Sequence, residues 1–259
     1  MRLKIYSCFF ILLFLFTLPS CDESADNSVI PATSSQTIVV VTDSVDDSHG
    51  TLYCFERQNS TANWEMVGEE MPVVVGENGL GWGEGLEKPT NLFDYSAKQE
   101  GDGRSPAGIF NLSLVFGRTP KDQMSDLKMP YLPLTEGIEC VDDQNSKYYN
   151  QIVDRDEIGS ENVDWKSSEK MYHYDTCYEL GVFVDHNLNP PKKGFGSCIF
   201  LHIWSDPDDS TAGCTAMEQI NMYEIAQWLD IEKQPVLIQL TKRSYQSVLE
   251  EWGLPDINQ

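Results

Sequence analysis

The stretch SCIFLHIWSDPDDSTAGCTAME, residues 197–218, decides the fold and holds most of its chemistry. Its first part, 197–204, is rich in aromatic and apolar residues, which predicts a buried strand. Because side chains alternate across a strand, Cys198, Phe200 and His202 should share one face. The imidazole of His202 is therefore expected on a defined side near the end of a strand.

A loop rich in aspartate follows that strand and leads to the sequence STAGC, which ends at Cys214. The next four residues, 215–218, have the form of a capping box, and apolar positions continue at helical spacing, which predicts a helix over 217–229. Cys214 should then lie directly before a helix N-terminus. The helix dipole and a nearby imidazolium would favour its thiolate and lower the thiol pKa from its reference value of about 8.5.

A nucleophile, a base and an oxyanion hole can all be placed within this one segment. Gly213 leaves room for a substrate backbone, and free backbone N–H groups at a helix start can stabilise an oxyanion. The same spacing also fits a second interpretation, in which Cys214 is half of a disulfide and His202 is a satisfied strand-end residue. Spacing alone does not choose between the two.

The segments that precede this stretch predict short strands joined by turns. Residues 103–112, GRSPAGIFNL, form a turn that feeds an alternating strand. The glycine-rich run 79–85 has neither the lysine of a phosphate loop nor a following helix pattern, so it does not predict nucleotide binding. Further β-branched or alternating runs lie at 37–42, 51–57, 64–67 and 72–76.

Residues 118–194 differ in character, since they are rich in Asp, Asn, Tyr and Lys and hold few long apolar runs. We interpret them as an elaborated loop or lid region whose aromatic residues mainly pack against the sheet. A strand is predicted over 235–240 and a short helix over 244–252. The whole predicts one β-rich domain over 37–241, followed by a C-terminal helix and tail, 242–259.

The charge of the chain narrows the classes of partner. The 259 residues include 41 acidic and 18 basic side chains, for a formal charge of -23. Nucleic-acid binding draws its affinity from Lys and Arg that neutralise phosphates, so DNA and RNA are excluded as partners. Anionic lipid headgroups would repel the same surface, and any membrane association must come from an anchor.

The N-terminus predicts such an anchor. Basic residues precede an apolar run at 8–18, which has the length of a signal-peptide core and is short for a membrane span. The following residues, LPSC, resemble the lipobox of bacterial lipoproteins, which implies a signal peptide over 1–20 and a lipid on Cys21. Residues 21–36 are polar and predict a flexible tether. An ordinary cleaved signal peptide or an uncleaved anchor is the alternative.

The cysteines outside the signal peptide and the lipidation site are odd in number, which suits one free nucleophile. Pairing among the others is left open by the spacing; they are Cys54, Cys140, Cys177 and Cys198. No close pair of Cys or His ligands occurs, so we predict no metal site. The four histidines, His49, His173, His186 and His202, are dispersed along the sequence. His173 and His186 are interpreted first as surface or loop residues, with substrate contact as the alternative.

Two segments resemble the landmarks of the L,D-transpeptidase catalytic domain, also called the YkuD-like domain. They are GRSPAGIFNL at 103–112, and His202 followed by STAGC. The resemblance spans residues 37–241 and implies a mainly β (α+β) fold of β-sandwich type, with a large loop insertion and a helix after the nucleophile. The site residues that it implies are Cys214 as nucleophile, His202 as general base, Gly213 before the nucleophile, Thr211 as the Ser/Thr of the motif, and Ile203, whose carbonyl orients the histidine.

The sequence departs from the family pattern at two places in the motif. The histidine that the family has two residues before the nucleophile is Ala212 here, and the polar or Arg/Asn position two residues after it is Ala216. The interval from His202 to Cys214 is also short. Because the base matches the upstream histidine, the enzymatic interpretation stands, with substrate contacts that differ from the family's.

The activity that the resemblance implies is acyl transfer on peptidoglycan stem peptides, with no cofactor. Cys214 would attack the carbonyl that joins an L-centre to a terminal D-alanine, leaving a thioester for an amine or water to resolve. The implied location is the bacterial cell envelope, lipid-anchored and facing the periplasm, with no oligomeric state indicated. The alternatives are a catalytically degenerate wall-binding lipoprotein on the same fold, and a structural protein with paired cysteines.

Overall fold

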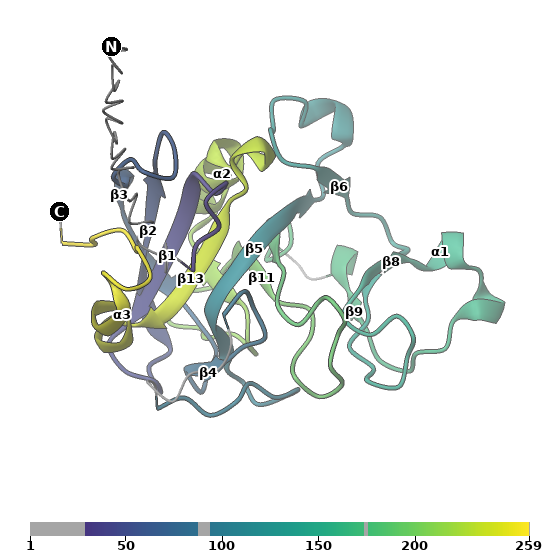
Figure 1. Ribbon diagram of the computed structural model, residues 1–259. Helices are drawn as coiled ribbons and strands as arrows, with labels where there is room; N and C mark the ends of the chain where they lie inside the picture. Colours follow the sequence, from purple (N-terminus) through teal and green to yellow (C-terminus); the bar gives the residue numbers. More distant parts are fainter. Residues whose placement is uncertain (1–28, 88–93, 174–175, 259) are drawn as a thin grey trace, which may run out of the picture.

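The computed structural model describes residues 29–87, 94–173 and 176–258 (Figure 1). Ten strands form the main sheet: β1 Gln36–Thr42, β2 His49–Glu56, β3 Glu65–Val74, β4 Leu80–Trp82, β5 Ser105–Gly117, β6 Tyr131–Pro133, β10 Leu180–Val184, β11 Phe200–Ile203, β12 Thr215–Met217 and β13 Val236–Thr241. Three short strands form a second sheet: β7 Ile138–Cys140, β8 Ile152–Asp154 and β9 Glu169–Lys170. The α-helices are α1 Arg155–Ile158, α2 Gln219–Trp228 and α3 Lys242–Val248. The 3₁₀ helices are η1 Lys121–Gln123, η2 Ser160–Asn162, η3 Met171–His173 and η4 Ile231–Lys233.

The main sheet closes on itself. Its strand order is β10-β11-β12-β3-β2-β1-β13-β5-β4, and β10 also pairs with β5, so that eight of these strands form a ring. β1 pairs in parallel with β13, with Thr37 opposite Val236, which joins the two ends of the domain. The mainly β fold predicted from the sequence is confirmed.

The core lies inside this ring, where the β-branched and aromatic runs bury their side chains. β1 is buried along its whole length because it has strand partners on both edges. α2 packs against β10 and β11, and α3 packs against β13 and β1. Figure 1 shows the two helices at opposite ends of the sheet. The helices thus cover the sheet while β11 and β12 remain available to carry the site.

Residues 134–173 form an extension beside the main sheet, on the side where Figure 1 labels β8, β9 and α1. A second apolar cluster joins the two parts, and its buried members are Phe116, Leu134, Ile138, Cys140, Met171, Tyr178, Phe183, Cys198, Phe200 and Cys214. The cluster takes residues from both the small sheet and the main sheet. The extension is therefore an elaboration of one domain, and the end of the predicted loop region, 180–184, belongs to the main sheet as β10.

The helix predicted over 217–229 is present but begins two residues later, and a strand separates it from Cys214. Residues 215–217 form strand β12, which pairs with β11 on one edge and β3 on the other, and α2 starts at Gln219. Pairing on both edges stabilises the strand more than a capping box stabilises a helix start, and Glu218 makes no side-chain cap hydrogen bond. The prediction that Cys214 directly precedes a helix N-terminus is wrong.

The strand predicted over 197–204 is shorter, since β11 begins at Phe200. Cys198 has a φ of 56°, a left-handed conformation that interrupts an extended strand. The predicted alternation nevertheless holds, because Phe200 belongs to the second cluster while Ile199, Leu201 and Ile203 belong to the main core.

The predicted tether is only partly described. Residues 1–28, which include the predicted signal peptide and Cys21, lie outside the described residues. From Val29 the chain is packed on the domain, with Ile30 1% exposed, so the segment 29–36 belongs to the fold and the tether prediction is wrong there. Within the described ranges, none of the helices has the length and apolar character needed to span a bilayer.

Candidate active site

Cys214 and His202 lie on adjacent strands and share a cavity. β11 and β12 run parallel with His202 opposite Ala216, so the side chain two residues earlier, that of Cys214, projects on the same face as the imidazole. The cavity has a volume of about 220 Å³. Its lining residues are Glu169, Cys177, Tyr178, His202, Trp204, Ser205, Asp209, Ser210, Thr211, Ala212, Cys214 and Ala216.

The imidazole of His202 is held in one orientation. Its Nδ1 lies 2.8 Å from the carbonyl oxygen of Ile203, so Nδ1 carries the proton and donates, and Nε2 is left as the acceptor. The ring of Tyr178 packs edge-on against it, with centroids 5.4 Å apart. Burial lowers the pKa of His202 to about 4, and the ring is therefore neutral near pH 7.

The thiol of Cys214 is also neutral in this structure. Its sulfur accepts a hydrogen bond from the N–H of Phe200 at 3.3 Å and donates to the carbonyl of Cys198 at 3.5 Å. Burial, followed by the charge of Glu169, raises the pKa of the thiol. The lowered pKa predicted from a helix dipole is wrong, because the residue is buried and a strand follows it.

The thiol and the imidazole form the walls of one cavity without a direct hydrogen bond. Among the described residues, the hydrogen-bond partners of the sulfur are backbone atoms of Phe200 and Cys198 and the side chain of Tyr178. The 3–4 Å hydrogen bond between Cys214 and His202 predicted from the sequence is absent from that set. The thiol must therefore turn from the Cys198 carbonyl to pass its proton to Nε2 of His202.

The backbone of the cysteine is fixed by two hydroxyl groups. The carbonyl oxygen of Cys214 accepts hydrogen bonds from Thr211 Oγ1 at 2.6 Å and Ser105 Oγ at 2.7 Å. The Ser105 hydroxyl in turn accepts from the N–H of Gly76 at 2.8 Å. The two sequence segments singled out above, 103–112 and 197–218, thus meet at the nucleophile.

Gly213 is required where it stands. Its φ of 154° is one that side-chain-bearing residues rarely adopt, and a Cβ there would come within 3.0 Å of the carbonyl oxygen of Arg104. The N–H of Gly213 donates to Thr211 Oγ1 at 3.1 Å and is not directed at a substrate. The N–H of Cys214 has no acceptor among the described residues, which makes it the group available to an oxyanion.

A carboxyl group that sequence analysis missed lies in the same cavity. The hydroxyl of Tyr178 donates to Glu169 Oε2 at 2.7 Å. Burial raises the pKa of Glu169 to about 7, and the charges of Asp142 and Glu100 add to the effect. Tyr178 was one of several aromatic residues noted in 118–194, but no periodicity or motif marks Glu169.

A disulfide connects the extension to the strand of the histidine. Cys140 is bonded to Cys198, and Cys140 also lies opposite Glu169 in the pairing of β7 with β9. The pairing that the spacing left open therefore joins Cys198 to Cys140. The remaining cysteines of the described chain are free thiols: Cys54, Cys177 and Cys214.

The two departures from the motif lie on the cavity wall. Ala212 is exposed at its rim, and Ala216 is buried beside His202. The formally charged residues that line the cavity, Glu169 and Asp209, are both acidic. The wall near the nucleophile is therefore small and apolar, and the charge of the cavity is negative.

The other histidines do not join this site. His49 is exposed, and so is His173, as predicted for a surface or loop residue. His186 lies in the loop after β10 but is 1% exposed, with Nε2 donating to the carbonyl of Phe195 at 2.9 Å and Nδ1 accepting from the N–H of Glu84, so it is a buried loop residue and not a surface one. Within the described part of the chain, no group of three or more His, Cys, Asp or Glu is placed to hold a metal ion.

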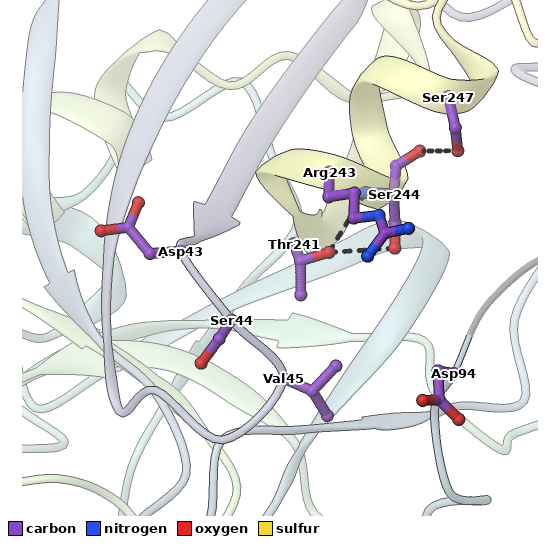
Figure 2. Close-up of a pocket in the computed structure, with 8 residues that line it drawn as sticks. All are labelled: Asp43, Ser44, Val45, Asp94, Thr241, Arg243, Ser244 and Ser247. Atoms are coloured by element: carbon purple, nitrogen blue, oxygen red, sulfur yellow. Dashed lines mark hydrogen bonds between the residues drawn. The ribbon is translucent and has the colours of Figure 1, made fainter.

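A larger cavity of about 550 Å³ lies elsewhere, at the start of α3 (Figure 2). Its lining residues are Asp43, Ser44, Val45, Asp94, Thr241, Arg243, Ser244 and Ser247. The hydrogen bonds drawn in Figure 2 include the cap of α3, in which Thr241 Oγ1 accepts from the N–H of Ser244. No thiol or imidazole lines it, so the reactive chemistry lies in the smaller cavity.

Comparison with known proteins identifies the family of this domain. The family model of the YkuD domain, the L,D-transpeptidase catalytic domain, matches residues 38–238. That range includes both segments that meet at Cys214. No curated protein and no solved structure matches the chain.

Proposed function

The chain belongs to the L,D-transpeptidase catalytic domain family, and from that premise we propose that it transfers acyl groups of peptidoglycan stem peptides through a thioester on Cys214. The family acts on such stem peptides. One observation carries the assignment to these residues. Cys214 and His202 line one cavity, and the Ile203 carbonyl fixes the ring with Nε2 as its acceptor.

The first half of the reaction proceeds from a neutral pair. As the sulfur attacks the carbonyl carbon before the terminal D-alanine, its proton passes to Nε2 of His202. A pKa of about 4 keeps that nitrogen unprotonated and ready near pH 7. The N–H of Cys214 stabilises the developing oxyanion, while Thr211 holds the loop through Gly213 and Cys214. The imidazolium then protonates the departing D-alanine amine.

Desolvation explains why the resting thiol need not be ionised. Separating charge in a buried cavity costs free energy when nothing compensates it, so thiol and imidazole stay neutral until a substrate carbonyl is present. Proton transfer and attack then occur together, and the oxyanion donor compensates the negative charge. The low pKa of His202 and the high pKa of Cys214 both follow from this burial.

A second candidate function is a wall-binding protein that has lost catalysis. Ala212 and Ala216 favour it, because the family has polar side chains at both positions and this cavity has methyl groups there. The shared cavity of Cys214 and His202, with the His202 ring oriented by the Ile203 carbonyl, favours the enzyme. The two candidates differ in one property, which is the formation of a covalent acyl adduct.

The experiment is therefore acylation. The wild-type chain is incubated with a carbapenem-like β-lactam and, separately, with tetrapeptide stems, and mass spectrometry locates the adduct while released D-alanine is measured. We expect an adduct on Cys214 that is lost in Cys214→Ala, and acylation slowed roughly 10²–10⁴-fold in His202→Ala. Binding of stems without adduct or D-alanine release in wild type would establish the non-catalytic candidate instead.

We also propose that the protein is a lipoprotein of the bacterial envelope, anchored through Cys21 and facing the periplasm. The apolar run at 8–18 and the cysteine that follows it support this. Metabolic labelling with a fatty-acid precursor should mark the wild-type protein and leave Cys21→Ala unmarked. An unlabelled wild-type product that is released from the membrane fraction would contradict the anchor.

A further inference from the structure

Glu169 has no role in the reaction as described so far, although its carboxyl group lines the cavity of Cys214 and His202. The extension delivers it there. β9 is only two residues long, and its Lys170 forms an ion pair with Glu139 while the neighbouring Glu169 turns to the cavity. The residue is therefore presented to the reacting groups by the part of the chain that lies outside the main sheet.

The carboxyl group is held with one oxygen engaged and the other available. Oε2 accepts the hydrogen bond from Tyr178, whose ring packs against His202. Oε1 has no hydrogen-bond partner among the residues that the structure describes. The disulfide between Cys140 and Cys198 fixes the position of β7, and Cys140 is the residue opposite Glu169 in the sheet. This carboxyl group is thus both oriented and accessible.

The charge of the cavity indicates what Oε1 would bind. Both formally charged lining residues are acidic, and His202 is neutral near pH 7. The positive charge of Lys98 lowers the pKa of the Cys214 thiol, but Lys98 is 3% exposed and already paired with Asp102 at 2.6 Å. A cationic group of a substrate would therefore find an uncompensated carboxylate in this cavity, whereas an anionic group would be repelled.

We propose that Glu169 is a catalytic residue of the second half-reaction, in which it binds the ammonium group of an amine acceptor and removes a proton from it. This inference rests on the function proposed above, because it needs the thioester on Cys214. It assigns the acceptor as a primary amine and not water. An alkylammonium ion cannot attack a carbonyl until it loses a proton, and a carboxylate at the site supplies both the attraction and the base.

The step balances as follows in protons and electron pairs. The ammonium group gives one proton to Glu169, and the nitrogen lone pair then forms a bond to the thioester carbonyl carbon. The second proton leaves the nitrogen for Nε2 of His202 as the tetrahedral intermediate forms. The carbon–sulfur bond breaks with its electron pair on sulfur, the imidazolium returns its proton to Cys214, and Glu169 releases its proton to solvent.

The environment of Glu169 suits it to this exchange. Burial, with the charges of Asp142 and Glu100, raises the pKa of Glu169 to about 7. A base whose pKa lies near the operating pH is both deprotonated in a useful fraction and strong enough to take a proton. An exposed glutamate, with a pKa of about 4.3, would be a much weaker base toward an ammonium ion.

The test compares three acceptors in wild type and in Glu169→Gln. The full-length chain is acylated with a tetrapeptide stem, and the thioester is resolved by an alkylamine-bearing stem peptide, by hydroxylamine, or by water. Hydroxylamine is neutral near pH 7 and needs no initial deprotonation. We expect Glu169→Gln still to form the Cys214 adduct and to transfer it to hydroxylamine, but the ratio of alkylamine transfer to hydroxylamine transfer should fall at least tenfold below that of wild type.

A matched control is Glu179→Gln. Glu179 also accepts a hydrogen bond from a tyrosine, Tyr223, at 3.0 Å, but it does not line the cavity. This variant should partition between amine and water as wild type does. Equal alkylamine transfer by wild type and Glu169→Gln, with the adduct formed in both, would overturn the role of Glu169.

Failure of the proposed function looks different, since wild type would then form no thioester with any stem. If the Glu169→Gln chain does not fold, a second measurement on wild type alone still tests the inference. In wild type itself, an alkylamine acceptor should be preferred to water, and a stem whose amine is acetylated should lose that preference and give hydrolysis only. Wild-type thioester that is hydrolysed equally fast with and without the free alkylamine would also overturn the inference.

Discussion

The hydroxyl of Ser105 donates a hydrogen bond of 2.7 Å to the carbonyl oxygen of Cys214, across 109 positions of sequence. Ser105 is fully buried at the start of β5, and it also accepts the N–H of Gly76. One side chain therefore fixes the backbone on which the nucleophile is mounted. It does so without touching the thiol.

Removing this hydroxyl should affect both stability and acylation. Ser105→Ala leaves the N–H of Gly76 and one lone pair of the Cys214 carbonyl without a partner, which should cost about 1–3 kcal/mol of unfolding free energy. Acylation should slow because the cysteine is less firmly placed. Urea unfolding and adduct formation measure the two effects.

Ser113→Ala is the control for that change. Ser113 lies on the same strand, but its hydroxyl donates to Asp185, away from the nucleophile. The Ser113→Ala variant should have a lower free energy of unfolding than wild type but should be acylated at the wild-type rate. If Ser113→Ala and Ser105→Ala slow acylation equally, the effect belongs to β5 as a whole and not to the Cys214 carbonyl.

The three free thiols should differ in reactivity, in an order opposite to the one that the sequence predicts. Cys214 and Cys54 are buried, with their thiol pKa raised by burial, to about 12 for Cys54, whereas Cys177 is partly exposed. Iodoacetamide near neutral pH should therefore modify Cys177 first, because the reactive form is an accessible thiolate. Peptide mass mapping gives the order. Faster labelling of Cys214 would mean that its thiolate is stabilised at rest.

How far the sequence predicts this site depends on how local each feature is. The shared face of Phe200 and His202 was predicted correctly, because alternation is a property of one strand. The position of the helix after Cys214 was predicted wrongly, because strand β12 is stabilised by pairing with β3 and β11. That pairing joins distant segments, and no local sequence pattern predicts it. The predicted lowering of the Cys214 thiol pKa depended on the helix and was wrong for the same reason.

Glu169 and the disulfide could not be predicted for a related reason. Both depend on how residues 134–173 fold onto the main sheet, and that segment has no regular apolar period to predict its path. The cysteine count predicted an unpaired thiol but left open that Cys140 would pair with Cys198. Contacts between segments that are distant in the sequence determine both the position of Glu169 and the disulfide pairing.

Loss of the disulfide should separate the extension from the strand of the histidine. The bond links residues 58 positions apart, and a double Cys140→Ser, Cys198→Ser variant should lose roughly 2–4 kcal/mol of unfolding free energy. Alkylamine transfer should fall more than hydrolysis, because Glu169 is no longer fixed opposite Cys140. Denaturant unfolding and product analysis test this, with Cys54→Ser as the control for loss of a buried thiol. Unchanged partition would show that Glu169 keeps its place without the bond.

Stability should depend on pH through the buried histidines. The folded-state pKa of both His186 and His202 is lowered to about 4 by burial. Each contributes stability that is fully present above about pH 6.5 and is lost as pH falls toward 4, by at most about 1.4 kcal/mol per pH unit. Glu169 acts in the opposite sense, since its raised folded pKa of about 7 gives stability that is present below about pH 4.5 and lost as pH rises through 7.

Glu169→Gln should therefore lose stability more steeply than wild type between pH 7 and 4.5, because the opposing proton uptake is gone. Urea unfolding at several pH values in that range measures the two slopes. Parallel slopes would mean that Glu169 titrates alike in the folded and unfolded chains.

The pairing of β1 with β13 bears on how the chain must be synthesised. Thr37 lies opposite Val236, so a strand made at the start waits almost the entire length of the chain for its partner. Contacts of such sequence separation slow folding, and until they form, β1 has an open edge able to pair with another chain. Any fragment that stops before β13 keeps that edge exposed and should aggregate. The sheet that carries Cys214 and His202 is therefore complete only once β13 has been made.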